Sequence, residues 1–142
     1  MKVRKSVGAF IVNKDGKFLL VRTHGRGDVY WDINKGGIEK RETPLNALKR
    51  ELKEELGTDK FGKIKKLNLS FTFEFPEEIK KDSGKEFQRV ELFSVEFLGK
   101  EEDIKVDNKE ISKAIFVDKN EFIKKVSFET TRNAFKKFIN SI

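Results

Sequence analysis

The sequence contains no cysteine and only one histidine. Disulfide bonds and thiol chemistry are therefore excluded, and nucleophilic schemes built on serine and histidine have little to work with. The absence of cysteine suits a cytoplasmic protein. The apolar runs at 9–12 and 18–21 are far shorter than the ~20 residues of a membrane-spanning helix. No N-terminal signal pattern is visible, so carboxylates with a metal ion are the chemistry that this composition offers.

Positive charge exceeds negative charge, with 31 lysine and arginine residues against 24 acids and a net charge of +7. A positive field favours polyanionic ligands such as nucleotides or RNA. Genome bias or heat adaptation produces the same richness in lysine and glutamate. The charge is therefore consistent with a nucleotide substrate but does not select one. A length of 142 residues fits one domain spanning residues 1–142.

Hydrophobic alternation and turn signals predict an α/β fold with a mixed sheet and helices packed on its faces. Strands are predicted at 2–12, 17–22, 67–75, 86–98 and 114–117, with a short apolar piece at 29–33. Residues 23–28 and 77–85 are predicted to be polar connections. Asp118 and Glu121 predict a capped short helix. A last helix is predicted to begin near Ser127, with an apolar stripe made by Phe135, Phe138, Ile139 and Ile142.

The strongest local signal is a helix over residues 44–56 that follows two glycines, which are predicted to form a loop. Thr43 is a favourable N-cap, and Pro44 suits the first helical position. Gly57 stands where a left-handed C-terminal residue is needed. One apolar stripe is predicted to face the core, formed by Leu45, Leu48, Leu52 and Leu56.

Three acids crowd the C-terminal half of this helix, at Glu51, Glu54 and Glu55. Like charges at i and i+4 cost a few tenths of a kcal/mol, and the helix dipole disfavours acids at this end. A helix built only for stability would carry lysine here. The acids form either a solvated charged face or a site for a hard cation such as Mg²⁺ or Mn²⁺.

The stretch 36–58 resembles the Nudix box, which runs Gly, five residues, Glu, seven residues, Arg-Glu, apolar, any residue, Glu-Glu, any residue, Gly, apolar. The matching residues are Gly36, Glu42, Arg50, Glu51, Leu52, Glu54, Glu55 and Gly57. Three positions depart from the family's preferences, with Asn34 in place of proline, Arg41 in place of glycine and Thr58 in place of an apolar residue. The resemblance implies an α/β/α sandwich and metal-dependent hydrolysis of a nucleoside diphosphate linked to another group.

Carried over by position, the resemblance implies that Glu51, Glu54 and Glu55 hold Mg²⁺ or Mn²⁺, with a backbone carbonyl of Lys35 or Gly36 completing one shell. Arg50 is expected to steer the glutamates by ion pairing. Two residues are expected to fix the loop, Glu42 and Gly37. Glu51 is the first candidate for the general base, with a purely metal-binding role as the alternative.

Outside the box, Glu110 precedes a strand that ends in an aromatic residue, as does a family glutamate that binds metal or acts as the base. Its alternative is a plain surface acid. Phe128 is expected either to stack on a base or to pack in the core. Tyr30 and Trp31 are expected either to pack in the core, which is the first interpretation, or to line the base pocket. Several basic residues are candidates for phosphate contacts, namely Arg22, His24, Arg26, Lys35, Arg41 and Arg89.

Two further segments resemble the family branch that cleaves dinucleoside polyphosphates and 5′-triphosphorylated RNA, at 73–76 and at 126–128 followed by Arg132. The first expectation is therefore a Mg²⁺-dependent hydrolase of dinucleoside polyphosphates such as diadenosine tetraphosphate. An RNA 5′-pyrophosphohydrolase or a pyrophosphatase that removes damaged nucleoside triphosphates is the alternative. A Nudix-fold nucleotide or RNA sensor without turnover is the alternative from another class.

Overall fold

The computed structural model describes residues 2–25 and 28–142. The strands are β1 (Val3–Val12), β2 (Phe18–Gly25), β3 (Asp28–Asp32), β4 (Asn34–Gly37), β5 (Phe61–Glu74), β6 (Phe87–Phe97) and β7 (Ile111–Val117). The helices are α1 (Pro44–Leu56), α2 (Glu77–Ser83), α3 (Lys119–Lys125), α4 (Glu129–Asn140) and a 3₁₀ turn, η1 (Glu101–Asp103).

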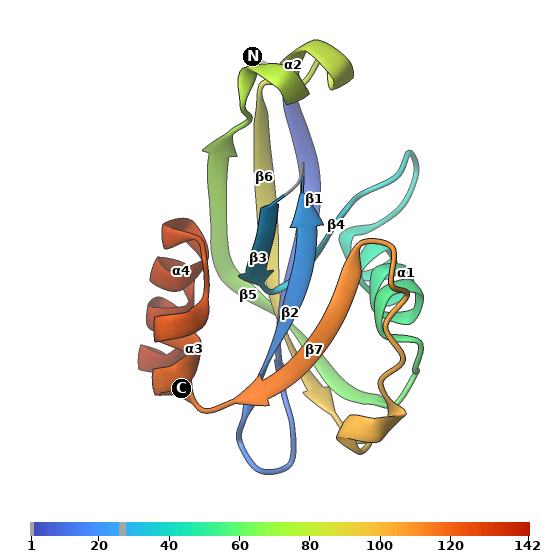
Figure 1. Cartoon of the computed structure of the whole chain (residues 1–142), viewed down its shortest axis with the longest axis vertical. Coiled ribbons are helices and arrows are strands. Elements are labelled where there is room, and N and C mark those ends of the chain that lie inside the picture. Colours follow the sequence, from blue (N-terminus) through green and yellow to red (C-terminus); the bar gives the residue numbers. More distant parts are fainter. Residues whose placement is uncertain (1, 26–27) are drawn as a thin grey trace.

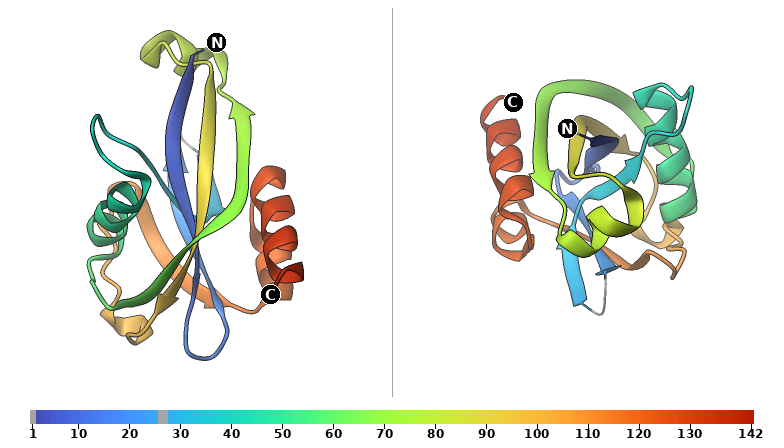
Figure 2. Two further views of the ribbon diagram at one scale, coloured as in Figure 1. Left: turned by 180° about the vertical axis from the view of Figure 1, so that it is seen from behind. Right: turned by 90° about the horizontal axis from the view of Figure 1, so that it is seen from above.

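The strands described in residues 2–25 and 28–142 form one seven-stranded mixed sheet. Its main path runs β3-β2-β1-β6-β5, while β4 pairs with β1 and β7 pairs with β2. The β1–β6 pair is parallel and the other pairs are antiparallel. Helix α1 lies on one side of the sheet, and α3 and α4 lie on the other (Figures 1 and 2). The predicted α/β/α sandwich with a mixed sheet is confirmed.

Strand β1 divides the core into two layers because its successive side chains point to opposite faces. Val7, Ala9 and Ile11 pack in the layer that contains the leucines of α1. Phe10 points the other way, against Phe122 of α3 and the phenylalanines of α4. The sheet therefore has helices on both faces, each covering an apolar layer.

The predicted start and end of α1 are confirmed. The Thr43 hydroxyl accepts a hydrogen bond from the Asn46 amide at 3.2 Å, and Gly57 adopts a left-handed φ of 63°. Leu48, Leu52 and Leu56 are buried as predicted. The prediction for Leu45 is wrong, since this residue is 39% exposed. Ile142 at the chain end is likewise exposed, although Phe135 and Phe138 are buried.

The two glycines expected in a loop belong instead to strand β4, where Gly36 lies opposite Val7 and Gly37 opposite Ser6 of β1. Strand β5 begins at Phe61, six residues before its predicted start. Register shifts between 61 and 64 and between 66 and 70 break the alternation there and hide the strand in the sequence.

Several other boundaries also differ from the prediction, and most of these differences add regular structure. Residues 77–83 form α2, which ends in a left-handed Gly84 rather than continuing as a connection. Strand β2 extends to Gly25, β7 begins at Ile111, and α4 begins at Glu129 instead of near Ser127. No helix among the described residues is long and apolar enough to span a membrane.

Two helix-capping glycines allow a matched test of the packing beyond α1. Gly57 and Gly84 both have left-handed backbones, with φ of 63° and 72°. A Cβ at Gly57 would lie 2.6 Å from the backbone oxygen of Lys105, whereas a Cβ at Gly84 would meet nothing within 4 Å. We expect Gly84→Ala to lower the free energy of unfolding by about 1–2 kcal/mol. Gly57→Ala should lower the free energy of unfolding further, because the backbone atoms of Lys105 must also shift. Urea denaturation measures the free energy of unfolding of both variants. Equal losses in the two variants would contradict the close packing against Gly57.

Candidate active site

The acids of α1 meet a third glutamate from outside the helix. Glu55 is buried, the Glu51 side chain is 13% exposed, and the Glu54 side chain is 58% exposed. One carboxylate oxygen from each of Glu51, Glu55 and Glu110 lies within 4.8 Å of the other two. Glu110 is itself exposed and directly precedes β7. The fold therefore gathers three carboxylates from two segments that are far apart in the sequence.

Gly36 makes room for one of these carboxylates. A Cβ at this position would lie 2.0 Å from Cδ of Glu51, closer than any side chain tolerates. The neighbouring Gly37 faces the other way, where a Cβ would meet the guanidinium of Arg4. The absence of a side chain at Gly36 thus allows Glu51 to lie directly against β4.

Arg50 connects α1 to the segment that precedes it. Its Nε and Nη2 donate to the two carboxylate oxygens of Glu42, at 2.8 and 2.9 Å. Its Nη1 donates to Glu51 at 2.8 Å, and Nη2 also donates to the carbonyl of Gly37 at 3.0 Å. A weaker contact reaches Glu54 at 3.4 Å. Only the planar, forked guanidinium satisfies this set of partners.

Glu42 orders the turn before α1. Hydrogen bonds from Arg50 and from the Glu39 amide hold the pKa of Glu42 well below its usual range, at about 2. The preceding residue, Arg41, has a left-handed φ of 69°. This conformation explains why the family prefers glycine at that position, and it carries strain in an arginine.

Glu55 lies in the most unusual electrostatic environment of the cluster. Burial raises its pKa to about 8, and the nearby charges of Glu51 and Glu110 act in the same direction. A hydrogen bond from Asn34 opposes this rise. Burial also raises the pKa of Glu51, although Arg50 opposes it. Full ionisation of these carboxyl groups would therefore place more negative charge in the cluster than its surroundings compensate.

Two neighbouring cavities meet at these acids. One, of about 370 Å³, is lined by Glu51, Glu54, Glu55, Asp107, Lys109 and Glu110. The other, of about 350 Å³, is lined by Val21, Thr23, His24, Asp32, Ile33, Lys35, Glu55, Glu110, Ile111 and Phe128. Because Glu55 and Glu110 line both, the two cavities adjoin at the carboxylate cluster.

Lys35 occupies the second cavity among aromatic rings. Its ammonium lies 5.4 Å from the ring centre of Phe128 and 5.1 Å from that of Phe73. It also pairs with the buried carboxylate of Asp32 at 2.8 Å. The Phe128 ring lies 5.1 Å from that of Tyr30. Phe128 is thus a half-buried wall of the cavity rather than a core residue.

Sequence reasoning missed two residues of this site. Asn34 donates to Glu55 Oε1 at 3.2 Å and is buried with it. Asp32 accepts from the Thr131 hydroxyl at 3.0 Å, which links β3 to α4. One signal for Asn34 was available in the sequence. It stands two residues before Gly36, and residues i and i+2 of a strand point to the same face, so Asn34 and Gly36 both face the acids of α1.

Three other phosphate-binding candidates, Arg22, Arg41 and Arg89, line neither of the two cavities. Arg22 donates to the Ser112 hydroxyl, Arg89 pairs with Glu91, and Arg41 is exposed. Arg26 lies outside the described residues. Trp31 is half-buried and packs against the core, while Lys125 lies over its ring. The phosphate-binding roles of Arg22, Arg26 and Arg41 stay predictions, as does the metal-binding role of the Lys35 or Gly36 carbonyl.

The carboxylate cluster fits a divalent cation. Three carboxylates offer the oxygen ligands that Mg²⁺ and Mn²⁺ prefer. The raised pKa of buried Glu55 indicates negative charge that a cation would neutralise. Glu54 lines the same cavity at its exposed side, so it remains available as a fourth carboxylate.

The NUDIX domain family model matches residues 2–138, nearly the whole chain. The chain belongs to the Nudix family. The family predicted from the box is thereby confirmed, and with it the class of Nudix hydrolases.

Curated relatives of this Nudix chain include two proteins named RNA pyrophosphohydrolase. The one from Bartonella henselae is 34% identical over 114 residues, which cover 73% of this chain and 66% of the relative. The one from Bartonella bacilliformis is 30% identical over 119 residues, covering 77% of this chain and 70% of the relative. The matched segment thus spans about two thirds of these relatives' length.

Solved structures share the Nudix fold at low sequence identity. The Escherichia coli dihydroneopterin triphosphate pyrophosphohydrolase has a TM-score of 0.79 and 18% identity, with all of both chains covered. A Caenorhabditis elegans Ap4A hydrolase has a TM-score of 0.74 and 20% identity, with 97% of this chain and 96% of that chain covered. At these identities the likeness establishes the fold alone.

The contact between Gly36 and Glu51 predicts a specific loss of metal binding. Gly36→Ala should displace the Glu51 carboxylate and weaken Mn²⁺ affinity by roughly tenfold or more, the size of effect seen when the support of a metal ligand is removed. Gly37→Ala is the matched control, because its Cβ meets only the far end of the flexible Arg4 side chain. Titration with Mn²⁺ followed by electron paramagnetic resonance measures both affinities. Equal affinities in the two variants would contradict this role.

Burial of Glu55 predicts a pH dependence of stability in the metal-free protein. The folded state keeps the Glu55 proton up to about pH 8, whereas the ordinary pKa of a glutamate is 4.5. The free energy of unfolding in EDTA should therefore fall as the pH rises from about 4.5 to about 8. Urea denaturation across this range should show a smaller fall in Glu55→Gln, with Glu54→Gln as the control for the loss of one charge. The same slope in wild type and Glu55→Gln would overturn the assignment.

Proposed function

We propose that this chain is a Mg²⁺- or Mn²⁺-dependent pyrophosphohydrolase that cleaves a phosphoanhydride bond in a nucleotide polyphosphate. The observation that carries the proposal is the meeting of Glu51, Glu55 and Glu110 within 4.8 Å at the junction of two cavities. One cavity is acidic and suits a metal with a polyphosphate. The other offers Lys35 among aromatic rings and suits the phosphates and base of a nucleotide.

In this proposal Glu51, Glu55 and Glu110 hold the cation, with Glu54 at the exposed side. A bound Mg²⁺ or Mn²⁺ would supply positive charge to the phosphate oxygens and acidify the attacking water. Arg50 keeps the Glu51 carboxylate in place through its hydrogen bond at 2.8 Å. Asn34 does the same for Glu55. These two side chains act by positioning ligands rather than by contacting substrate.

The reaction needs a base for the attacking water. Water oxygen forms the new bond to phosphorus, the bridging P–O bond breaks, and the water proton passes to a carboxylate. Glu51 is our first candidate for this carboxylate because it lines the acidic cavity beside the other two glutamates, and a purely metal-binding role is its alternative. Glu110 is the second candidate, since it is exposed and lines both cavities.

For the substrate, the names of the curated relatives favour the 5′ end of triphosphorylated RNA over our first expectation of a dinucleoside polyphosphate. The net charge of +7 suits either polyanion. The paired rings of Tyr30 and Phe128, 5.1 Å apart beside Lys35, supply a surface on which the base of either substrate can stack. A dinucleoside polyphosphate therefore remains the second candidate.

A nucleotide sensor without turnover is less well supported. A protein that only binds a nucleotide has little need of a buried glutamate beside two others. The intact set of Arg50, Glu51, Glu54 and Glu55 favours an enzyme.

A substrate panel tests the proposal. Purified protein with Mg²⁺ or Mn²⁺ should release pyrophosphate or phosphate from 5′-triphosphorylated RNA, or ATP and AMP from diadenosine tetraphosphate. We expect Glu54→Gln and Glu55→Gln to lower kcat/KM by about 10²-fold or more, because each removes charge that organises the cation. Glu102→Gln, in the exposed 3₁₀ turn, should leave activity unchanged. Tight nucleotide binding without turnover across the panel would favour the sensor instead.

A further inference from the structure

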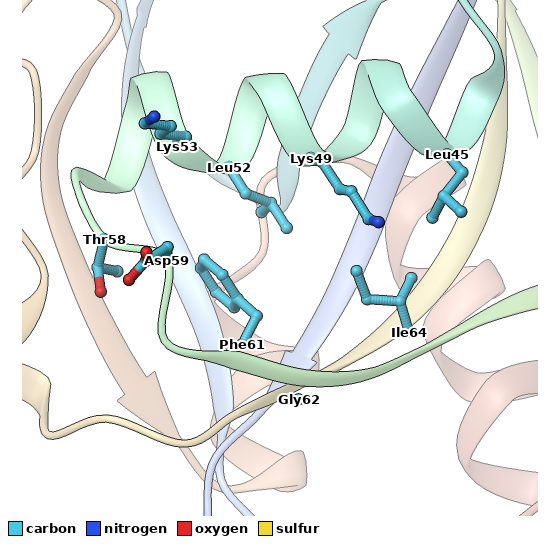
Figure 3. Close-up of a pocket in the computed structure, with 9 residues that line it drawn as sticks. All are labelled: Leu45, Lys49, Leu52, Lys53, Thr58, Asp59, Phe61, Gly62 and Ile64. Carbon is cyan, nitrogen blue, oxygen red and sulfur yellow. The ribbon is translucent and has the colours of Figure 1, made fainter.

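A second surface of α1 borders a groove that the proposed reaction does not use. This groove, of about 540 Å³, lies between α1 and the first residues of β5 (Figure 3). It is lined by Leu45, Lys49, Leu52, Lys53, Thr58, Asp59, Phe61, Gly62 and Ile64. We propose that this groove docks an extended segment of a partner protein that carries apolar and acidic side chains.

The floor of the groove is apolar and open. Leu52 is buried, Phe61 and Ile64 are half-buried, and Leu45 is 39% exposed. Figure 3 shows these side chains pointing into the gap from the helix on one side and the strand on the other. An apolar side chain placed between them would cover surface that water now reaches, which stabilises a complex. The exposure of Leu45, unexpected for an apolar position on this helix, fits such a use.

The shape of the groove favours an extended occupant. Strand β5 is the last strand of the main sheet path and, among the described strands, pairs only with β6. One side of its backbone therefore lacks a strand partner in the sheet, and an added strand is a common way to use such an edge. From Leu45 to Lys53 the helix runs about 12 Å, at ~1.5 Å per residue. This length matches about four residues of extended chain at ~3.3 Å each.

The charge of the groove favours an acidic segment. Lys49 and Lys53 are exposed on its helical rim, and neither pairs with an acid in the described part of the chain. Asp59 is the one acid among the lining residues. A second copy of the chain docked by the same groove would place Lys49 and Lys53 against their own counterparts. Like-charge contact disfavours this arrangement, whereas an acidic segment would neutralise both lysines.

The groove and the carboxylate cluster lie on opposite sides of α1. At 100° per residue, Lys49 and Lys53 project roughly opposite to Glu51 and Glu55. Neither adjoining cavity of the candidate active site includes a residue that lines the groove. Substitutions in the groove therefore test docking without removing any residue assigned to the reaction.

The test is selection of a random-peptide display library on the immobilised full chain, followed by fluorescence anisotropy with the enriched peptides. We expect enriched sequences in which apolar residues alternate with Asp or Glu. Their affinity should fall by about tenfold or more in Lys49→Glu/Lys53→Glu. The matched control is Lys136→Glu/Lys137→Glu, which makes the same charge change on two exposed positions of α4 and should leave the affinity unchanged.

Charge reversal in the peptide separates docking from damage to the fold. A peptide with its acids replaced by lysine should bind Lys49→Glu/Lys53→Glu and not the wild type. The proposal is overturned if no sequence is enriched, or if both double variants weaken binding equally. It is also overturned if sedimentation shows a dimer that Leu45→Glu abolishes, because the groove would then bind a second copy. Activity on the substrate panel should be unchanged in every groove variant, so failure here is distinguishable from failure of the proposed reaction.

Discussion

The hydrogen bonds of one guanidinium hold the candidate site together. Arg50 binds both oxygens of Glu42, one oxygen of Glu51 and the carbonyl of Gly37. These partners lie before α1, on α1 and at the end of β4, so a single side chain fixes three segments relative to one another. Each partner carries full or partial negative charge. The positive charge of the Arg50 guanidinium therefore also offsets the repulsion that would otherwise push the helix away from the turn.

Local signals were sufficient to predict the helix and the family of the chain. Thr43 and Gly57 define the ends of α1 through backbone geometry that depends on few neighbours. The spacing of Glu51 and Glu55 follows from helical periodicity alone, and the Nudix pattern identified their role as candidate metal ligands. The alternating strands gave the mixed sheet and its two helical layers for the same reason, since a period of two residues needs no tertiary information.

The features that were missed depend on contacts between distant segments. Asn34 matters because β4 pairs with β1 and thereby faces the buried Glu55. Asp32 matters because Thr131, from α4, reaches its carboxylate. The start of β5 was hidden because its register shifts remove the alternation that marks a strand. Leu45 resembles a core leucine by spacing, yet β5 does not cover it, and only the arrangement of helix and strand reveals this (Figure 3).

The burial of Glu55 affects the metal-free protein and its cation-bound form differently. With a pKa of about 8, this side chain carries a proton at neutral pH when no cation is bound. The buried carboxyl group is then neutral, so the metal-free protein avoids the cost of burying that charge without a partner. A divalent cation that binds at this position would replace the proton of the Glu55 carboxyl group. The affinity of this site for a cation would therefore depend on pH through this one carboxyl group.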